Sequence, residues 1–353
     1  MVHLSKLRSS VILKCLLCLL SFAPLAFTPQ AFAETPQAQL KGLPTCKGVD
    51  IIEEMRIIEP ERYKKLKRVS DIEKNSNAVL WRIEGATGAP SYLFGTMHTT
   101  DPEVTAFSDQ AKAAFKEAKT VAVEIANLKP TTIQAYIQKN SNKFFSLKGP
   151  KLNEYLSQDD YSYVINLAVK QGMPKNMIPL LKPWFAYISY FQIPGCEAFR
   201  MSNGLVSLDQ HIIKRAKLAG KRLVGLESLD DQFSAFDALA PKHQVTLLQD
   251  GIFQHKRIND FYFTAMQLYK SRQIGMMIPL SIAFGKDEEK TTAAMAEFLE
   301  IMVVKRNKQM FEHSLPLVNK GGAFIAVGAL HMTGQHGLVE AFRSAGYDVT
   351  KIN

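Results

Sequence analysis

Near its C-terminus the chain reads AFIAVGALH over residues 323–331. The residues between Gly322 and Gly328 are all apolar, which is typical of a buried strand. Gly328 lets the backbone turn closely at the strand end, so that the imidazole of His331 can point into a crevice. Ligand sites of α/β sheets form at such strand ends. This stretch therefore predicts a buried strand followed by a functional histidine.

The same pattern occurs far upstream, where the strand-like run Ser91-Tyr92-Leu93-Phe94 leads into Gly95-Thr96-Met97-His98. Residues 79–84 alternate in polarity, and turn residues join them to this run as a β-hairpin. We predict further strands at 121–125, 222–227 and 347–352, and helices at 108–119, 209–219 and 338–345. Whether the two Gly-x-x-His units are a diverged internal repeat or a coincidence stays open.

Strand–helix–strand units at both ends of the chain, with a helical middle, indicate an α/β fold. We expect a central mixed sheet built from the N- and C-terminal units and a large helical insertion subdomain. In this division, residues 46–353 form a single domain with helical insertions at about 128–205 and 230–319.

Residues 1–33 are predicted to be a cleavable signal peptide. Three basic residues lead an apolar stretch that ends at Ala31-Phe32-Ala33, the small-x-small pattern that signal peptidase accepts. Lys14 and Pro24 leave fewer than the ~20 apolar residues of a spanning helix, which disfavours a membrane anchor. We therefore expect a periplasmic or secreted protein with a flexible leader at 34–45 and no stable membrane span in the mature chain.

Composition and missing motifs argue against several classes of protein. Removing residues 1–33 leaves 320 residues and lowers the formal net charge from +10 to +7. No run of Lys and Arg interleaves with aromatic residues, so this charge does not predict nucleic-acid binding. The phosphate-binding loop, the His-Glu-x-x-His zinc motif and the Gly-x-Ser-x-Gly elbow are absent from the sequence.

Two of the four cysteines lie in the predicted signal peptide, which leaves Cys46 and Cys196. An even pair in an exported protein predicts a single disulfide bond. Such a bond would tie the N-terminal segment to the helical middle. The alternative is a pair of buried thiols.

Four residues at predicted strands carry the candidate chemistry. His98 and His331 each follow an apolar strand, and Glu124 interrupts the apolar run of residues 121–125. A buried carboxylate needs a cation, an arginine or a metal as its partner, and Glu227 raises the same question. Two imidazoles and a carboxylate can hold a divalent metal ion and leave positions open for water. A histidine after a strand can equally be a hydrogen-bonded structural residue.

Several of these segments together resemble the TraB/GumN family, which includes the TIKI proteases. The matching segments include Phe94-Gly95-Thr96-Met97-His98, Val123-Glu124, Leu208-Asp209, Gly225-Leu226-Glu227-Ser228, Arg306-Asn307 and Val327-Gly328-Ala329-Leu330-His331. Cys196 also fits a cysteine of secreted members. The resemblance covers the chain from about Cys46 to its C-terminus. One departure, Gly334-Gln335-His336-Gly337, adds His336 as a further polar group.

The resemblance implies a metal-dependent, peptidase-like site. It makes His98 and His331 metal ligands, supported by Gly95 and Gly328 of the paired motifs. Glu124 is then a third ligand, or the base that takes a proton from the attacking water.

Arg306, Asn307 and Glu227 occupy further polar positions of the family pattern. We expect Arg306 to stabilise an oxyanion and Asn307 to orient it. The sequence thus predicts an exported hydrolase that uses a divalent metal ion to cleave a peptide or protein substrate. The alternatives are a non-catalytic envelope protein that binds a metal or haem-like ligand at the same histidines, or a polar cluster that is only structural.

Overall fold

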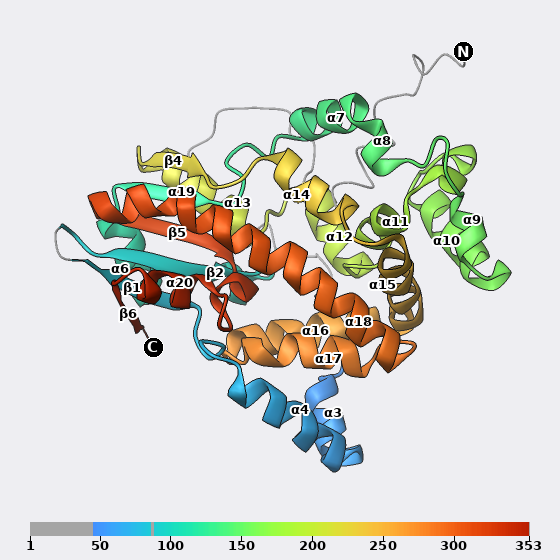
Figure 1. Cartoon of the computed structure of the whole chain (residues 1–353), viewed down its shortest axis with the longest axis horizontal. Coiled ribbons are helices and arrows are strands. Elements are labelled where there is room, and N and C mark those ends of the chain that lie inside the picture. The colour runs from blue at the N-terminus through green and yellow to red at the C-terminus, as the bar shows by residue number, and fades with distance from the viewer. Residues whose placement is uncertain (1–44, 86–87, 353) are drawn as a thin grey trace.

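Six strands form one mixed sheet in the order β4-β3-β5-β2-β1-β6 (Figure 1). The strands are β1 (Leu80–Glu84), β2 (Ser91–Thr96), β3 (Thr120–Val123), β4 (Arg222–Gly225), β5 (Ala323–Gly328) and β6 (Asp348–Lys351). The strands from β4 to β2 run parallel, whereas β1 pairs antiparallel with both β2 and β6. The predicted α/β fold, with a central mixed sheet built from both ends of the chain, is confirmed.

The structure is a computed structural model that describes residues 45–85 and 88–352. The predicted signal peptide, residues 1–33, and residues 34–44 of the predicted leader lie outside the described residues. Within the described part of the chain, no helix has both the length and the apolar character needed to cross a bilayer.

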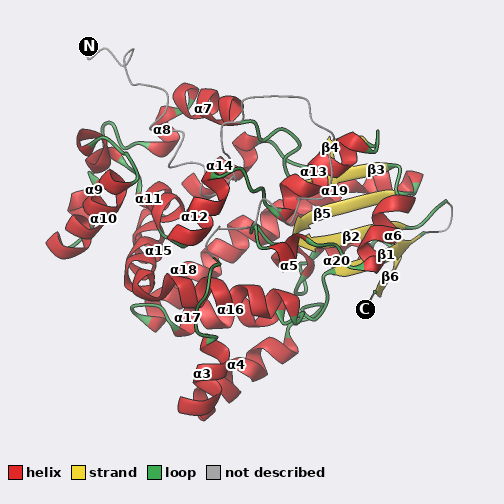
Figure 2. Ribbon diagram, turned by 180° about the vertical axis from the view of Figure 1, so that it is seen from behind, coloured by secondary structure: helices red, strands yellow, loops and turns green. Residues whose placement is uncertain are grey.

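The sheet is the middle layer of three, because helices cover both of its faces (Figure 2). Helices α6 (Asp109–Glu117), α13 (Leu208–Leu218) and α16 (Ile258–Lys270) pack on one face, and α19 (Arg306–Lys320) and α20 (Leu338–Ser344) pack on the other. Along β5, Phe324 and Ala326 point to the first face while Ile325 and Val327 point to the second. This burial on both sides explains why β5 is apolar without interruption.

Gly321 forms the turn that connects α19 to β5. Its φ is +75°, a conformation that residues with a Cβ atom rarely adopt. A Cβ atom there would also lie 2.7 Å from the backbone oxygen of Ala89. The turn therefore requires glycine for both its conformation and its packing.

The strands β3 and β4 end earlier than predicted, at Val123 and Gly225. Backbone hydrogen bonds nevertheless continue beyond them, because Leu226 N–H donates to Val123 O and Glu227 N–H donates to Glu124 O. Glu124 and Glu227 consequently lie side by side just past the ends of neighbouring strands rather than inside them.

The long middle of the chain is helical, as expected. Its helices are α7 (Pro130–Lys139), α8 (Ser141–Phe144), α9 (Leu152–Tyr155), α10 (Gln158–Lys170), η2 (Lys175–Leu180), α11 (Pro183–Tyr190), α12 (Gly195–Ser202), α14 (Leu229–Asp237), α15 (Pro241–Gln254), η3 (His255–Arg257), η4 (Ile274–Met276), α17 (Met277–Ala283), α18 (Glu288–Leu299) and η5 (Glu300–Lys305). A further short helix, α5 (Pro102–Thr105), follows β2. Residues from both predicted insertions share one aromatic core, in which Phe144 and Trp184 contact Phe233.

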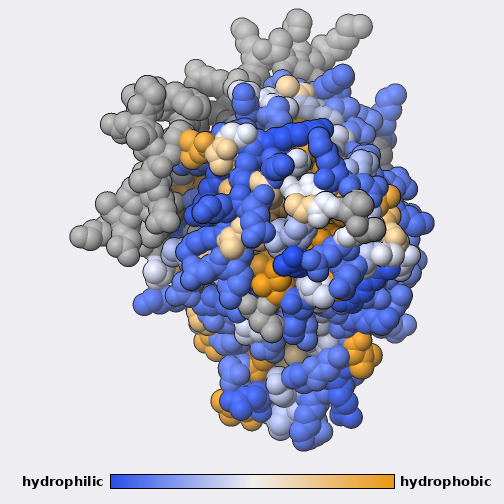
Figure 3. Space-filling model, turned by 90° about the vertical axis from the view of Figure 1, so that its left-hand side faces the viewer, coloured by the Kyte–Doolittle hydropathy of each residue, from blue (hydrophilic) through white to orange (hydrophobic). Residues whose placement is uncertain are grey.

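A helical hairpin, α3 (Ile51–Ile58) and α4 (Pro60–Ile72), packs against α16 and α17 through a small apolar core. Figure 3 shows a mostly hydrophilic face with scattered hydrophobic atoms, some of them at its lower end, where this hairpin lies. Just before the hairpin, Cys46 forms a disulfide bond with Cys196 in α12. The predicted disulfide is therefore present, and it links the N-terminal segment to the helical middle.

Candidate functional site

The predicted site residues gather at the carboxyl edge of the parallel strands. His98 follows β2, Glu124 follows β3, and His331 lies in η6 (Ala329–Met332), the short helix after β5. β3, β5 and β2 are consecutive neighbours in the sheet, so their carboxyl ends meet at one edge. This topology brings together two histidines that are 233 residues apart in the sequence.

The two motif glycines allow the neighbouring segments to approach each other. A Cβ atom on Gly95 would lie 2.9 Å from the Cα atom of Ala329, so a side chain there would collide with the second motif. Gly328 lies against Glu124: its N–H donates to Glu124 Oε1 at 2.7 Å, and a Cβ atom would be 3.3 Å from the same oxygen. The glycines thus serve the contact between the motifs as well as the local turns.

His331 is buried and held in one orientation by Asn307. Its Nδ1 lies 2.7 Å from Asn307 Oδ1, while Asn307 Nδ2 donates to the backbone oxygens of His331 and His336. Since Oδ1 must then accept, His331 carries its proton on Nδ1 and leaves the lone pair of Nε2 free. Burial, together with the positive charge of Arg306, lowers the pKa of His331 to about 3, so the ring is neutral near pH 7.

His98 is anchored in the same way by Asp209, the second residue of α13. Its Nδ1 lies 2.7 Å from Asp209 Oδ2, and the hydroxyl of Thr96 donates to Asp209 Oδ1 at 2.6 Å. The charge of Asp209 raises the pKa of His98 to about 9, against the opposing effect of burial. Water screens part of this attraction, because the side chain is 54% exposed. As in His331, the other ring nitrogen, Nε2, is not engaged by the anchoring residue.

Glu124 lies beside His331 and is paired with Arg306. Its Oε2 is 3.0 Å from Arg306 Nη2, and its Oε1 is 3.9 Å from His331 Nε2. Burial, the largest single effect, would raise the pKa of this carboxyl group, but Arg306 together with smaller contributions from His331, His98 and the Gly328 N–H outweighs burial, and the pKa falls to about 2. Glu124 is therefore a carboxylate across the physiological pH range.

Arg306 serves a second buried carboxylate, because its Nε and Nη2 donate to Glu227 at 2.9 and 2.6 Å. Its Nη1 donates to the backbone oxygen of Met302, inside η5. η5 is a π-helix turn that joins α18 to α19, and such turns often occur at functional sites. The side chains of Arg306 and Asn307, the first two residues of α19, both reach the site from this turn.

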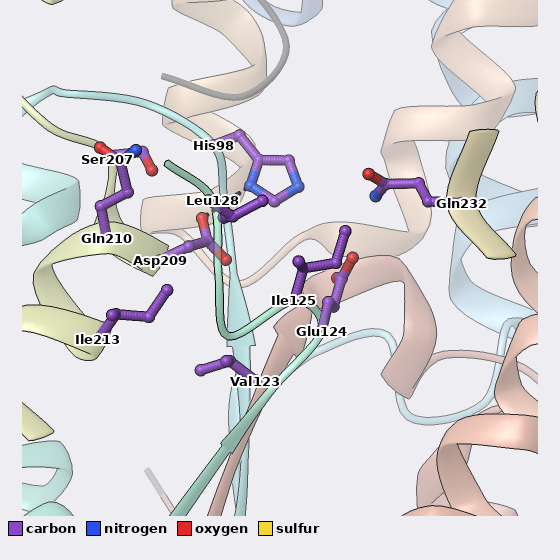
Figure 4. A pocket seen from close by; sticks show the side chains of 10 residues that line it. All are labelled: His98, Val123, Glu124, Ile125, Leu128, Ser207, Asp209, Gln210, Ile213 and Gln232. Carbon is purple, nitrogen blue, oxygen red and sulfur yellow. Dashed lines mark hydrogen bonds and ion pairs between the residues drawn. The ribbon is translucent and has the colours of Figure 1, made fainter. Parts of the chain in front are cut away.

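His98 and Glu124 line a common cleft, shown in Figure 4. The imidazole and the carboxylate border the same space, and the amide of Gln232 faces it from the other side. Apolar side chains complete the lining: Val123, Ile125, Leu128 and Ile213. The cleft therefore offers an apolar surface directly beside the polar cluster.

The donor types at this edge suit a divalent metal ion. Each motif histidine has its Nδ1 fixed by an acceptor, the arrangement that usually orients metal-ligating imidazoles through Nε2. In His331 this nitrogen has its lone pair free, whereas in His98 a metal would have to displace a proton. A permanently charged carboxylate lies beside them. Within residues 45–85 and 88–352, however, no group of three His, Cys, Asp or Glu side chains is already placed to hold a metal ion. The residues fit a metal by their chemistry and their anchoring, whereas their present positions form no complete ligand shell.

The structure gives Asp209 and His336 roles that differ from those expected from the sequence. Asp209, which anchors His98, was not among the predicted site residues; the Leu208-Asp209 match to the family pattern was the one signal that pointed to it. The side chain of His336 is exposed, and it is its backbone oxygen that accepts a hydrogen bond from Asn307.

Fold and site define an α/β protein whose paired Gly-x-x-His motifs end neighbouring parallel strands beside a buried Glu–Arg–Glu cluster. The sequence profile of the TraB/PrgY/gumN family matches residues 79–351, and the chain belongs to this family.

Curated relatives carry the name metalloprotease. Metalloprotease TIKI2 of Xenopus tropicalis is 24% identical over 320 residues, which cover 78% of this chain and 60% of that protein. Metalloprotease TIKI1 of Homo sapiens is 23% identical over 316 residues, covering 77% of this chain and 61% of that protein. The chain thus spans about 60% of the length of these relatives. No solved structure gave a significant match.

Proposed function

We propose that this protein is an exported metal-dependent hydrolase that cleaves peptide bonds in a peptide or protein substrate. The observation that carries the proposal is the matched anchoring of His98 and His331. Each donates its Nδ1 proton to a fixed acceptor, so that Nε2 is the ring nitrogen left for a metal at one edge of the sheet; on His98, whose pKa is about 9, the metal would displace a proton from Nε2. The metalloprotease names of the relatives agree with this chemistry.

In this proposal His98 and His331 hold a divalent metal ion. Such an ion supplies Lewis acidity toward the scissile carbonyl and makes water a better nucleophile near neutral pH. Glu124 contributes the anionic ligand. A carboxylate whose pKa is about 2 is a weak proton acceptor near pH 7, which favours the role of ligand over that of general base.

The remaining polar residues position these groups. Asn307 fixes the tautomer and orientation of His331, and Asp209 does the same for His98. Arg306 keeps Glu124 charged and neutralises Glu227. That Arg306 also stabilises the oxyanion and Asn307 orients it stays a prediction.

The lining of the cleft suggests the kind of substrate. Ile125, Leu128 and Ile213 provide an apolar wall beside His98, and the amide of Gln232 faces it. We therefore expect a peptide with an uncharged, apolar side chain next to the scissile bond, whose polar backbone can bond to the Gln232 amide.

Metal analysis of the purified mature chain tests the proposal. We expect His98→Ala and His331→Ala each to lose most of the bound metal, and Glu124→Gln to lose metal-dependent peptide hydrolysis while keeping the fold. His243→Ala is the matched control, because His243 Nδ1 also contacts a carboxylate, Glu297, at 2.6 Å but lies outside the site. It should keep its metal.

Two outcomes would decide against the proposal. Full metal-dependent hydrolysis by the double variant His98→Ala/His331→Ala would refute the assignment of the ligands. Metal or haem binding without any hydrolysis of peptide and ester panels would instead support the non-catalytic binding protein.

A further inference from the structure

A buried glutamate outside the proposed reaction contacts the segment that carries His98. Glu197, in α12, is 0% exposed. Its Oε1 accepts the backbone N–H of Thr100 at 2.6 Å, and its Oε2 accepts the Thr100 hydroxyl at 2.8 Å. Thr100 lies two residues after His98, so both bonds fix the backbone of the loop that follows β2.

Three helices, α12, α13 and α16, form hydrogen bonds to Thr99 and Thr100 of this loop. Arg200, also in α12, donates from Nη2 to the backbone oxygen of Thr100 at 2.9 Å. At the start of α13, the N–H of Leu208 donates to the backbone oxygen of Thr99. In α16, the hydroxyl of Tyr262 bonds to that of Thr99. The loop is thus fixed by two side chains in addition to Glu197 and by one backbone N–H, from elements far apart in the sequence.

The disulfide bond ties one of these helices, α12, to the N-terminal segment. Cys196 directly precedes Glu197 in α12, and its partner Cys46 begins the segment that docks on α16. In that segment the Ile51 N–H donates to Thr264 Oγ1 at 2.8 Å, and Thr264 lies two residues after Tyr262 in α16. The bond therefore connects the helix that carries Glu197 with a segment that hydrogen-bonds to the helix that carries Tyr262.

We propose that Glu197 is a positioning residue for His98, and that the Cys46–Cys196 bond keeps Glu197 in place. Asp209 orients the His98 ring, whereas Glu197 fixes the backbone from which the ring extends. Two hydrogen bonds to a carboxylate in a dry interior are strong and directional. Without the carboxylate, the N–H and hydroxyl of Thr100 stay buried and unpaired, and the loop must shift to satisfy them.

The chain offers a matched control for Glu197. Asp250 is also buried, at 5% exposure, and accepts one backbone N–H, from Lys286, and one threonine hydroxyl, from Thr291, each at 2.8 Å. It lies outside the candidate site. Asp250→Ala therefore removes the same two kinds of hydrogen bond without touching the His98 loop.

The experiment compares Glu197→Ala, Glu197→Gln, Cys196→Ser and Asp250→Ala in the full mature chain. The first readout is the imidazole ¹⁵N signal of His98 in metal-free protein, and the second is Zn²⁺ affinity by calorimetry. Glu197→Ala should move or broaden the His98 signal and weaken Zn²⁺ binding about 10- to 100-fold, the range for lost outer-shell partners. Glu197→Gln should restore both, because its amide can accept from the Thr100 N–H and donate to the Thr100 hydroxyl.

Cys196→Ser should move the His98 signal in the same direction as Glu197→Ala, and Asp250→Ala should leave it unchanged. The proposal is overturned if Glu197→Ala keeps the wild-type signal, or if Asp250→Ala changes it equally. A wild-type His98 signal in Cys196→Ser would show that the disulfide bond does not keep Glu197 in place. The Zn²⁺ readout rests on the proposed function; if wild-type protein binds no Zn²⁺, that function fails while the His98 signal still decides the role of Glu197.

Discussion

Arg306 is the cation for two carboxylates that are otherwise buried together. Its side chain is 9% exposed, and those of Glu124 and Glu227 are 10% and 0% exposed. Replacing it by an apolar residue of similar length would leave both carboxylates without a positive partner. Removal of one partner from a buried ionic cluster is far more damaging than loss of a surface pair.

We therefore expect Arg306→Met to lower the free energy of unfolding by about 3–5 kcal/mol at pH 7. Urea denaturation followed by circular dichroism measures it. Adding Glu227→Gln to Arg306→Met should recover part of the loss, since one uncompensated charge is then gone. If the two substitutions instead destabilise additively, the carboxylates do not depend on Arg306 as described.

His211 makes the free energy of unfolding depend on pH. Burial, with smaller contributions from the positive charges of Arg215 and Lys214, lowers its pKa from 6.5 to about 4. Between these values the unfolded chain takes up a proton that the folded chain does not. The contribution is therefore fully present above pH 6.5 and is lost as the pH falls toward 4.

The loss through His211 can reach at most about 3 kcal/mol, at 1.36 kcal/mol per pKa unit. In His211→Gln, which cannot titrate, the free energy of unfolding should fall less between pH 6.5 and 4 than in the wild type. Denaturant titrations at several pH values in that window compare the two slopes. Equal slopes would show that His211 is not held neutral by the fold.

The sequence identified some of the site residues but not the partners that orient them. His98 and His331 follow apolar runs, so a strand pattern suffices to place each at a strand end, whereas Glu124 was expected inside the strand that it follows. Asp209 reaches His98 from 111 residues away, and that contact exists only once α13 packs on the sheet. Local sequence patterns do not predict such a contact.

Among the elements, the strands and their order of appearance were predictable from alternation, apolar runs and glycine punctuation. The ends of β3 and β4 were not, because Glu124 and Glu227 continue the backbone hydrogen bonding beyond the last ladder residues. The π-helix turn of residues 300–305 was not predictable either, since one widened turn hardly changes helical periodicity. That turn precedes Arg306 and Asn307, which the family resemblance identified and the local pattern did not.

The disulfide bond joins Cys46 to Cys196, which are 150 residues apart in the sequence. In the chain-entropy view, closing a loop of that length stabilises the fold by about 4–5 kcal/mol, and measured values are often smaller. We expect Cys46→Ser/Cys196→Ser to lower the free energy of unfolding by a few kcal/mol, with a lower melting temperature. Thiol titration of denatured, unreduced wild type should find no free thiol from this pair; two free thiols would contradict the bond.

For the whole molecule, topology explains how a site can be built from the two ends of the chain. β2 and β5 are parallel neighbours, with Thr96 opposite Gly328, although the helical middle separates them in sequence. Since strands of one sheet align their carboxyl ends, the meeting of the two motifs was predictable from the strand pattern. The way the helices of the middle pack on one another was not, because their apolar faces do not specify partners.

Cleavage of the predicted signal peptide can be tested on the exported protein. Residues 1–33 have a basic start, an apolar stretch and the Ala31-Phe32-Ala33 ending, so the exported protein should begin at Glu34. An oxidising compartment would also favour the Cys46–Cys196 bond over two thiols. N-terminal sequencing of protein from the envelope and secreted fractions, with the cytoplasmic fraction as control, decides the matter. Protein that retains Met1 in a purified membrane fraction would show that the segment serves as an anchor, and the assignment to a periplasmic or secreted hydrolase would then have to be abandoned.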